Sequence, residues 1–216
     1  MPIVRGTEHA TIDCCLVVIN PTSGNSIGLD TANQVNVAIA TETTDAVKLI
    51  VKGKLIAQKK GLTTVTGNTL TLTDNVFNYE LAKILQGGTI NYWTSAAKTT
   101  TTTTPTEYGI AGYVPPVAGS DDRGEKFTVD LYTGVYDASG EVQEYQKISY
   151  PNCSGQPFGI GAQDGTFRVQ EMTIDSAPST GQAPYEISIV DILPTVTMSS
   201  AETNSNSGSG NASGGN

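Results

Sequence analysis

Residues 74–88, DNVFNYELAKILQGG, have helical spacing in a chain whose other segments alternate like β-strands. Asp74 is a good N-cap, because its carboxylate can accept hydrogen bonds from the free amides of a first turn. Gly87 can adopt the left-handed conformation that ends a helix, and Lys83 suits the C-terminal end of the dipole. The apolar residues recur on a single stripe: Phe77, Leu81, Ile84 and Leu85. The pattern predicts one short helix over about 74–86 that lies on a sheet.

The rest of the chain predicts about ten strands and no βαβ alternation. Gly67 and Asn68 are expected to form the two-residue turn of a hairpin within 62–73, and Gly53 a bulge or a change of sheet. The segment 126–136, the turn 137–140 and the segment 141–150 form the strongest predicted hairpin. The other expected strands are 11–20, 34–41, 46–58, 89–93, 108–114, 157–162, 166–175 and 185–193. We therefore predict a mainly β fold, an antiparallel sandwich or barrel-like domain of two packed sheets with one flanking helix.

Domain organisation follows from length and composition. The chain has 216 residues, within reach of one large all-β domain. Six threonines occupy 99–104, and residues 199–216 contain no apolar side chain larger than Ala. Because such a segment cannot offset its ordering entropy by burial, we expect a single domain over 1–198 and a flexible Ser/Gly/Asn-rich tail over 199–216.

The net charge of −9, from 21 acidic and 12 basic residues, argues against a groove that binds the phosphates of a nucleic acid. Five lysines do cluster, at positions 48, 52, 54, 59 and 60. They lie within a strand pattern and its turn, which favours a solvated strand face or a charge-protected edge over nucleic-acid binding.

The residue types that catalysis or metal binding needs are scattered. His9 is the single histidine and lies near the terminus, so no Ser-His-Asp triad or zinc set is expected. Asp121, Asp122 and Asp164 could supply oxygen ligands, but turn chemistry explains them better than a calcium loop does. Paired carboxylates for glycoside hydrolysis are not singled out. We predict no enzyme activity, no cofactor and no metal site.

Three further expectations concern the remaining side chains. Cys14, Cys15 and Cys153 are predicted to be reduced thiols, because neighbouring strand residues point to opposite faces and cannot easily bridge each other. Tyr132, Tyr136 and Tyr145 are expected to form an aromatic ladder rather than a ligand site. The N-terminal residues lack the apolar region of a signal peptide, and no window approaches the roughly 20 apolar residues of a membrane span.

Residues 53–90, GKLIAQKKGLTTVTGNTLTLTDNVFNYELAKILQGGTI, resemble the major tail tube proteins of long-tailed bacteriophages. The resemblance consists of a hairpin, the pattern T-L-T-L-x-D at 69–74, and a short helix that ends in a glycine pair and continues into a strand. It covers about a fifth of the chain.

The resemblance implies two orthogonally packed sheets flanked by one helix, in a virion protein made in the bacterial cytoplasm. Six subunits would close into a ring, and stacked rings would form a conduit for DNA ejection without specific DNA binding. The implied partners are other copies of the chain, a tape measure protein, and tail terminator or baseplate proteins. We further expect the connections 95–107 and 112–125 to contact a neighbouring subunit.

Two alternatives remain open at this point. The first is another virion or secretion-tube protein of related fold, such as a tail terminator or a baseplate tube subunit. The second is a carbohydrate-binding β-sandwich.

Overall fold

The computed structural model describes residues 10–92, 110–137 and 139–198. In these ranges the chain is mainly β with antiparallel sheets and one helix, α1 (Tyr79–Gln86), which confirms the predicted fold class. The strands are β1 (Thr11–Pro21), β2 (Ile27–Leu29), β3 (Ala32–Thr43), β4 (Val47–Val51), β5 (Lys54–Lys59), β6 (Thr63–Asp74), β7 (Thr89–Tyr92), β8 (Ile110–Val114), β9 (Phe127–Tyr136), β10 (Val142–Gly155), β11 (Gln170–Ser176), β12 (Glu186–Val190) and β13 (Thr197–Met198).

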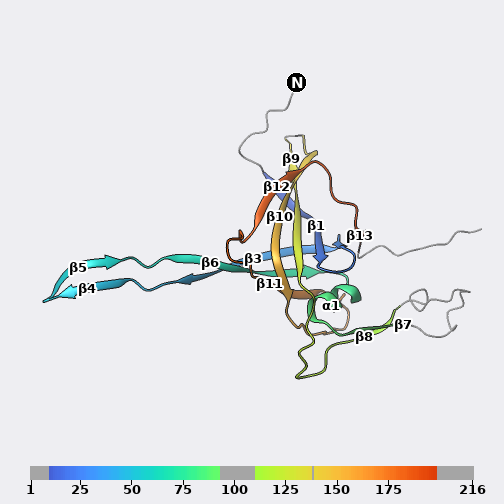
Figure 1. Cartoon of the computed structure of the whole chain (residues 1–216). Coiled ribbons are helices and arrows are strands. Elements are labelled where there is room, and N and C mark those ends of the chain that lie inside the picture. The colour runs from blue at the N-terminus through green and yellow to red at the C-terminus, as the bar shows by residue number, and fades with distance from the viewer. Residues whose placement is uncertain (1–9, 93–109, 138, 199–216) are drawn as a thin grey trace, which may run out of the picture.

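The strands form two layers that run across each other (Figure 1). β1, β9, β10 and β12 make the upright layer, and β3, β6 and β11 make the transverse layer. The hydrogen-bonded order is β13-β2-β1-β9-β10-β11-β6-β3, and β12 also pairs with β10. Only the short pairing of β13 with β2 is parallel among the described pairs.

The long strand β10 joins the two layers. Its residues 145–149 pair with β12, whereas its residues 153–155 pair with β11. Between these parts, the register against β9 shifts between Tyr150 and Cys153, and Asn152 has a φ of 49°. Pro151 cannot donate a ladder hydrogen bond, so the strand can bend there and pass from one layer to the other.

The main core lies between the layers and under the helix. Val17, Ile19 and Val129 enter it from the upright layer, while Leu70 and Ile174 enter it from the transverse layer. Each of these side chains is at most 1% exposed. Full burial of one such side chain contributes roughly 1.5–3 kcal/mol, so this contact between layers is the main source of stability.

Helix α1 closes one side of this core with Leu81 and Leu85, which are 1% and 0% exposed. The predicted start of the helix is wrong. Asn78 is the N-cap, and its side chain accepts from the amides of Glu80 and Leu81. Asp74 instead ends β6, where it is fully buried and accepts a hydrogen bond from Thr31 Oγ1.

The predicted end of the helix is confirmed. Gly87 has a φ of 81° and donates its amide to the carbonyl of Lys83. The glycines of the 115–155 region that face the helix are also required by space. A Cβ on Gly124 would lie 2.1 Å from the Ile84 carbonyl oxygen, and a Cβ on Gly155 would lie 2.5 Å from that of Leu85.

The predicted hairpin turn at Gly67 and Asn68 is wrong, because both residues lie inside the continuous strand β6. Gly67 is needed there for a different reason: a Cβ would lie 2.4 Å from the carbonyl oxygen of Ser176. The turn is at Lys52 and Gly53 instead, where both φ values are positive, 50° and 77°. Positive φ at both central residues is the requirement of a two-residue hairpin turn.

Other strand predictions have mixed outcomes. The hairpin of β9 and β10 is confirmed, as are strands close to the predicted 11–20, 34–41, 89–93, 108–114, 166–175 and 185–193. The predicted strand 157–162 is wrong, since 156–169 is a long loop, and β2 was not predicted. The predictions for residues 95–107 and 199–216 concern segments outside the described residues.

Across the described ranges, no helix has the length and hydropathy needed to cross a membrane.

Candidate assembly interface

The structure does not bring together the acidic residues that the sequence analysis considered as possible metal ligands. Among the described residues, no group of three or more His, Cys, Asp or Glu side chains is placed to hold a metal ion. Asp121 and Asp122 lie in the β8–β9 connection, where Asp122 accepts from the Gly88 amide, and Asp164 lies in the loop 156–169. His9 lies outside the described residues.

The three cysteines are free thiols. Burial raises the pKa of Cys14 and Cys15, and it raises the pKa of Cys153 from 9.0 to about 11. Because the thiolate is the nucleophile, a thiol held in the protonated form is poorly suited to covalent catalysis. Cys153 is 0% exposed and belongs to the core between the layers.

A partly buried ionic network lies in the upright layer. Lys147 Nζ is 3.0 Å from Asp130 Oδ2, and the same carboxylate accepts from Asn20 and Ser149. Burial lowers the pKa of Lys147, but the hydrogen bond and ion pair to Asp130 outweigh burial and raise it. This network ties β1, β9 and β10 together, and we assign it a structural role.

The three tyrosines of the predicted ladder occupy adjacent strand positions: Tyr132 and Tyr136 are alternate residues of β9, and Tyr145 of β10 lies opposite Gly134 between them. Tyr132 is 5% exposed and packs in a small cluster with Leu16 and Val18, which Tyr145 also contacts. The hydroxyl of Tyr136 donates to Asp13 Oδ2 at 3.2 Å. Alternate residues of a strand share a face, so this arrangement is compatible with the predicted ladder.

The dominant surface feature is a projecting two-stranded ribbon, which we call the arm and define as residues 36–66. Every residue of the arm is exposed. It consists of the outer parts of β3 and β6 followed by β4 and β5, and it extends far beyond the two layers (Figure 1). At about 3.3 Å per strand residue, the part from 40 to 52 alone extends roughly 40 Å.

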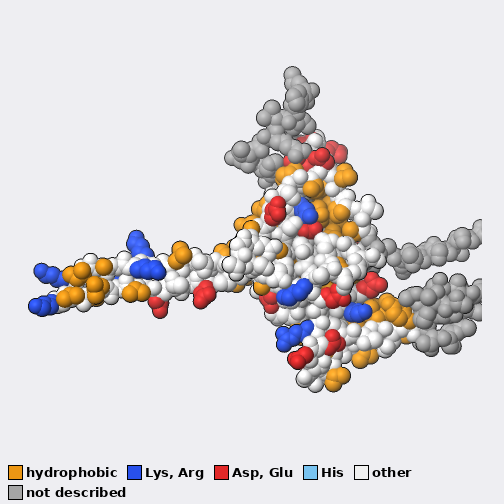
Figure 2. Space-filling model, in the orientation of Figure 1, with side chains coloured by type: hydrophobic (Ala, Val, Ile, Leu, Met, Phe, Trp, Pro, Cys, Tyr) orange, Lys and Arg blue, Asp and Glu red, His pale blue; other side chains and the backbone are white. Residues whose placement is uncertain are grey.

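The arm carries apolar side chains on both of its faces. Residues directly opposite each other in an antiparallel pair share a face. Leu49 lies opposite Ala57, and Ile50 lies opposite Leu55 on the other face. The large apolar side chains of the outer arm are between 48% and 66% exposed: Val47, Leu49, Ile50, Val51, Leu55, Ile56 and Leu62. Figure 2 shows them gathered near the free end.

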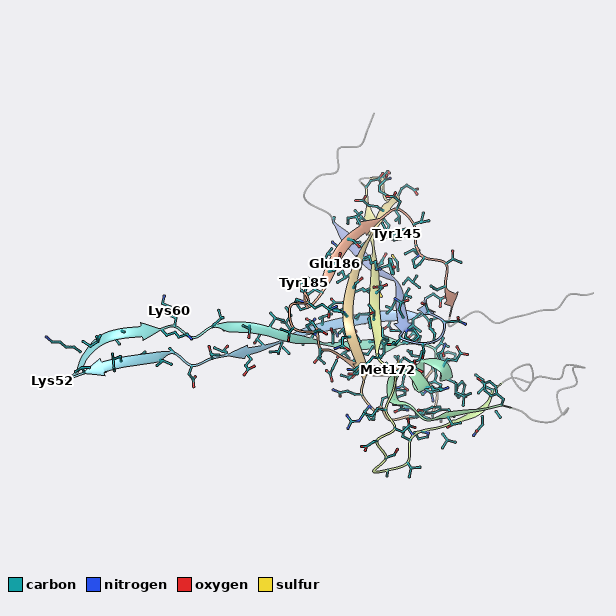
Figure 3. All side chains as sticks on the ribbon, viewed as in Figure 1. Lys52, Lys60, Tyr145, Met172, Tyr185 and Glu186 are labelled. Carbon is teal, nitrogen blue, oxygen red and sulfur yellow. The ribbon has the colours of Figure 1, made fainter. Side chains whose placement is uncertain are left out.

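The outer arm, residues 46–62, is also strongly basic. It contains five lysines and no acidic residue, so a chain of net charge −9 carries −14 elsewhere. Figure 2 shows lysines at the end of the arm, and Figure 3 places Lys52 at the tip and Lys60 further back. The sequence-based interpretation of a solvated face accounts for the lysines, but it does not account for the apolar side chains between them.

The arm also has open edges in the part of the chain that the structure describes. β4 and β5 form a sheet of two strands, and β3 is the last strand of the large sheet. An isolated two-stranded ribbon is marginal in water, and long open edges invite pairing with another chain. The arm thus combines exposed apolar faces, positive charge and open strand edges. Together these features indicate a contact surface.

Comparison with known proteins gives no family: no protein-family model matches the chain, and no curated protein matches it.

Proposed function

We propose that this chain is a structural subunit that assembles with copies of itself, and specifically a major tail tube subunit of a long-tailed bacteriophage. In this proposal six copies close into a ring, rings stack into a tube, and the tube conducts DNA during ejection. The chain catalyses no reaction and needs no cofactor. Its expected place is the virion, with a tape measure protein and tail terminator or baseplate proteins as further partners.

The arm is the observation that supports this proposal most strongly. An exposed ribbon with two apolar faces is stabilised when a partner covers it. Two arms cannot pair with each other favourably, because each outer arm carries five positive charges. The complement of a basic arm is instead the acidic remainder of another copy. Such a contact joins two different surfaces, and contacts of this kind generate rings or filaments.

The fold is compatible with the proposal, since it has two crossing layers flanked by one helix. The acidic balance of the chain outside the arm also suits a duct, because negative walls repel the phosphates of DNA. A tail terminator or a baseplate tube subunit would share these features. Such a subunit would form single rings or need a second chain to assemble.

Negative-stain microscopy of the purified full chain tests the proposal. We expect rings with six-fold symmetry and tubes, with an association that weakens as salt screens the charges. Single rings that lengthen only after addition of another virion protein would favour the related tube proteins. Particles that stay monomeric across protein and salt concentrations would contradict assembly altogether.

A further inference from the structure

The loop 156–169, which joins β10 to β11, carries apolar side chains that the body does not cover. Phe167 is 98% exposed, Ile160 is 56% exposed and Val169 is 51% exposed. Positions Gly159, Gly161 and Gly165 have no described atom within 4 Å of the place where a Cβ would lie. The start of the loop is anchored, because Phe158 packs against the main core and its amide donates to Gln86 Oε1. The exposed apolar side chains further along the loop are available to a partner.

The same loop bounds an open hollow of about 630 Å³. Phe167, Val169 and Glu171 are among its lining residues, and Asp164 lies in the loop beside them. The one basic residue of the lining is Arg168, whose guanidinium lies 4.5 Å from the centroid of the Phe77 ring. This cation–π contact engages the guanidinium, whereas Asp164 and Glu171 are exposed carboxylates.

We propose that this loop is the receptor for the arm of a neighbouring copy. This inference rests on the proposed function, since it requires that the chain self-associates. The two surfaces match in kind. The arm brings Ile50 and Leu55, which lie opposite each other, next to Lys52 and Lys54 at its tip. The loop and the first residues of β11 bring Phe167 together with Asp164 and Glu171. Apolar side chains would meet at the centre, with opposite charges at the rim, as in a stable protein interface.

A second hollow on the body suits the arm less well. It has a volume of about 620 Å³ and lies beside the C-terminal end of α1, where Arg123 and Lys126 line it. Its two acidic residues are already hydrogen-bonded: Asp122 accepts from the Gly88 amide, and Asp175 accepts from Thr69 and Gln156. The approach of lysines to this hollow would be opposed by Arg123 and Lys126.

The composition of the arm also disfavours other kinds of partner. The outer arm contains no aromatic residue and no arginine, the side chains that stack on nucleic-acid bases. A two-stranded ribbon within a bilayer would leave the backbone groups of both edges unpaired, which is costly in hydrocarbon. A second copy of this chain is therefore the occupant to which the proposal commits.

Charge reversal on both surfaces tests the pairing in the full chain. The arm variant is Lys52→Glu with Lys54→Glu, and the loop variant is Asp164→Lys with Glu171→Lys. We expect each variant alone to need at least about tenfold more protein to assemble than the wild type. A mixture of the two variants should assemble again, because the reversed arm of one matches the reversed loop of the other. The control variant is Glu141→Lys with Glu186→Lys, two exposed positions outside both surfaces and outside the connection 112–125.

The outcomes separate this inference from the proposed function. If the wild type assembles and the loop variant assembles equally well, the loop is not the receptor although self-assembly stands. If the mixture of the two variants does not assemble, the charges of the arm and of the loop do not contact each other. A wild type that remains monomeric overturns both statements.

An apolar substitution provides an independent measurement. Phe167→Ser should raise the concentration needed for assembly by at least about tenfold, because a central aromatic anchor is lost. Val117→Ser is the matched control, since Val117 is 78% exposed and lines the second hollow. A larger effect of Val117→Ser than of Phe167→Ser would place the main apolar contact at the second hollow and the connection 112–125, and it would contradict the proposal. Circular dichroism of each variant checks that the fold is retained.

Discussion

At the scale of single residues, stability depends on the side chains that lie between the two layers. Leu70 is 0% exposed and contacts the core from β6. Leu70→Ala should lower the free energy of unfolding by about 2–5 kcal/mol, because it leaves a cavity among groups that cannot fully collapse. Urea unfolding followed by circular dichroism measures this change. Val117→Ala is the control, and an equal loss in both variants would show that Leu70 is not in the core.

Cys153 provides a prediction of pH dependence. Its pKa is about 11 in the folded chain against 9.0 for a free thiol, because burial disfavours the thiolate. The unfolded chain therefore releases this proton at lower pH than the folded chain does. The resulting stability is fully present below pH 9 and is lost as the pH rises toward 11, by roughly 2–3 kcal/mol in total.

The measurement for Cys153 is the urea-unfolding free energy at a series of pH values, compared with that of Cys153→Ala. The difference between the two proteins should decrease above pH 9. A difference that is constant between pH 8 and pH 11 would mean that the thiol titrates equally in the folded and unfolded chains.

At the scale of elements, the start of α1 has two candidate N-cap residues, Asp74 and Asn78, and the structure identifies Asn78 as the cap. Asn78 accepts from two amides of the first turn at 2.8 and 3.0 Å. Asn78→Ala should cost about 1 kcal/mol of stability, whereas Asn78→Ser should retain most of it because serine also caps well. Thermal unfolding of the three proteins measures this. Equal stability of the alanine and serine variants would contradict Asn78 as the cap.

Some elements could be predicted from sequence patterns alone. The stripe of α1, its glycine end and the hairpin of β9 and β10 follow from spacing and turn residues within one segment. The N-cap was misplaced because Asp74 and Asn78 are both good capping residues, and only the buried contact of Asp74 with Thr31 decides between them. That contact joins residues 43 positions apart, which no local pattern reveals.

The turn wrongly predicted at Gly67 and Asn68 and the unpredicted turn at Lys52 and Gly53 have the same explanation. Gly67 is a glycine because β11 approaches closely, and its neighbour Asn68 is 2% exposed and donates to the Pro184 carbonyl. The actual turn at Lys52 and Gly53 lies within a segment that alternates like one continuous strand. Placing a turn between residues of similar pattern needs the register of pairing, which tertiary contacts fix.

At the scale of the whole molecule, composition and alternation were enough to predict a mainly β fold with one helix. They were not enough to predict the arm. The five lysines predict a solvated strand face or a charge-protected edge, but no pattern predicts that every residue from 36 to 66 is exposed. The candidate interface is therefore a product of topology: β3 and β6 continue past the edge of the body, and nothing described covers them.

Our central claim is that the arm joins one copy of the chain to another, and shortening the arm tests it most directly. Thr43 and Thr63 lie opposite each other in the pairing of β3 with β6, and their hydroxyl oxygens are 2.9 Å apart. Residues 44–62 can therefore be replaced by Asn-Gly, which suits a two-residue hairpin turn and leaves the core untouched. This variant should fold with the thermal stability of the wild type.

The measurement is sedimentation velocity of the wild type and the shortened variant at matched concentrations. We predict large assemblies for the wild type and a monomer for the shortened variant. Assemblies of the same size from a folded, arm-shortened chain would contradict the account.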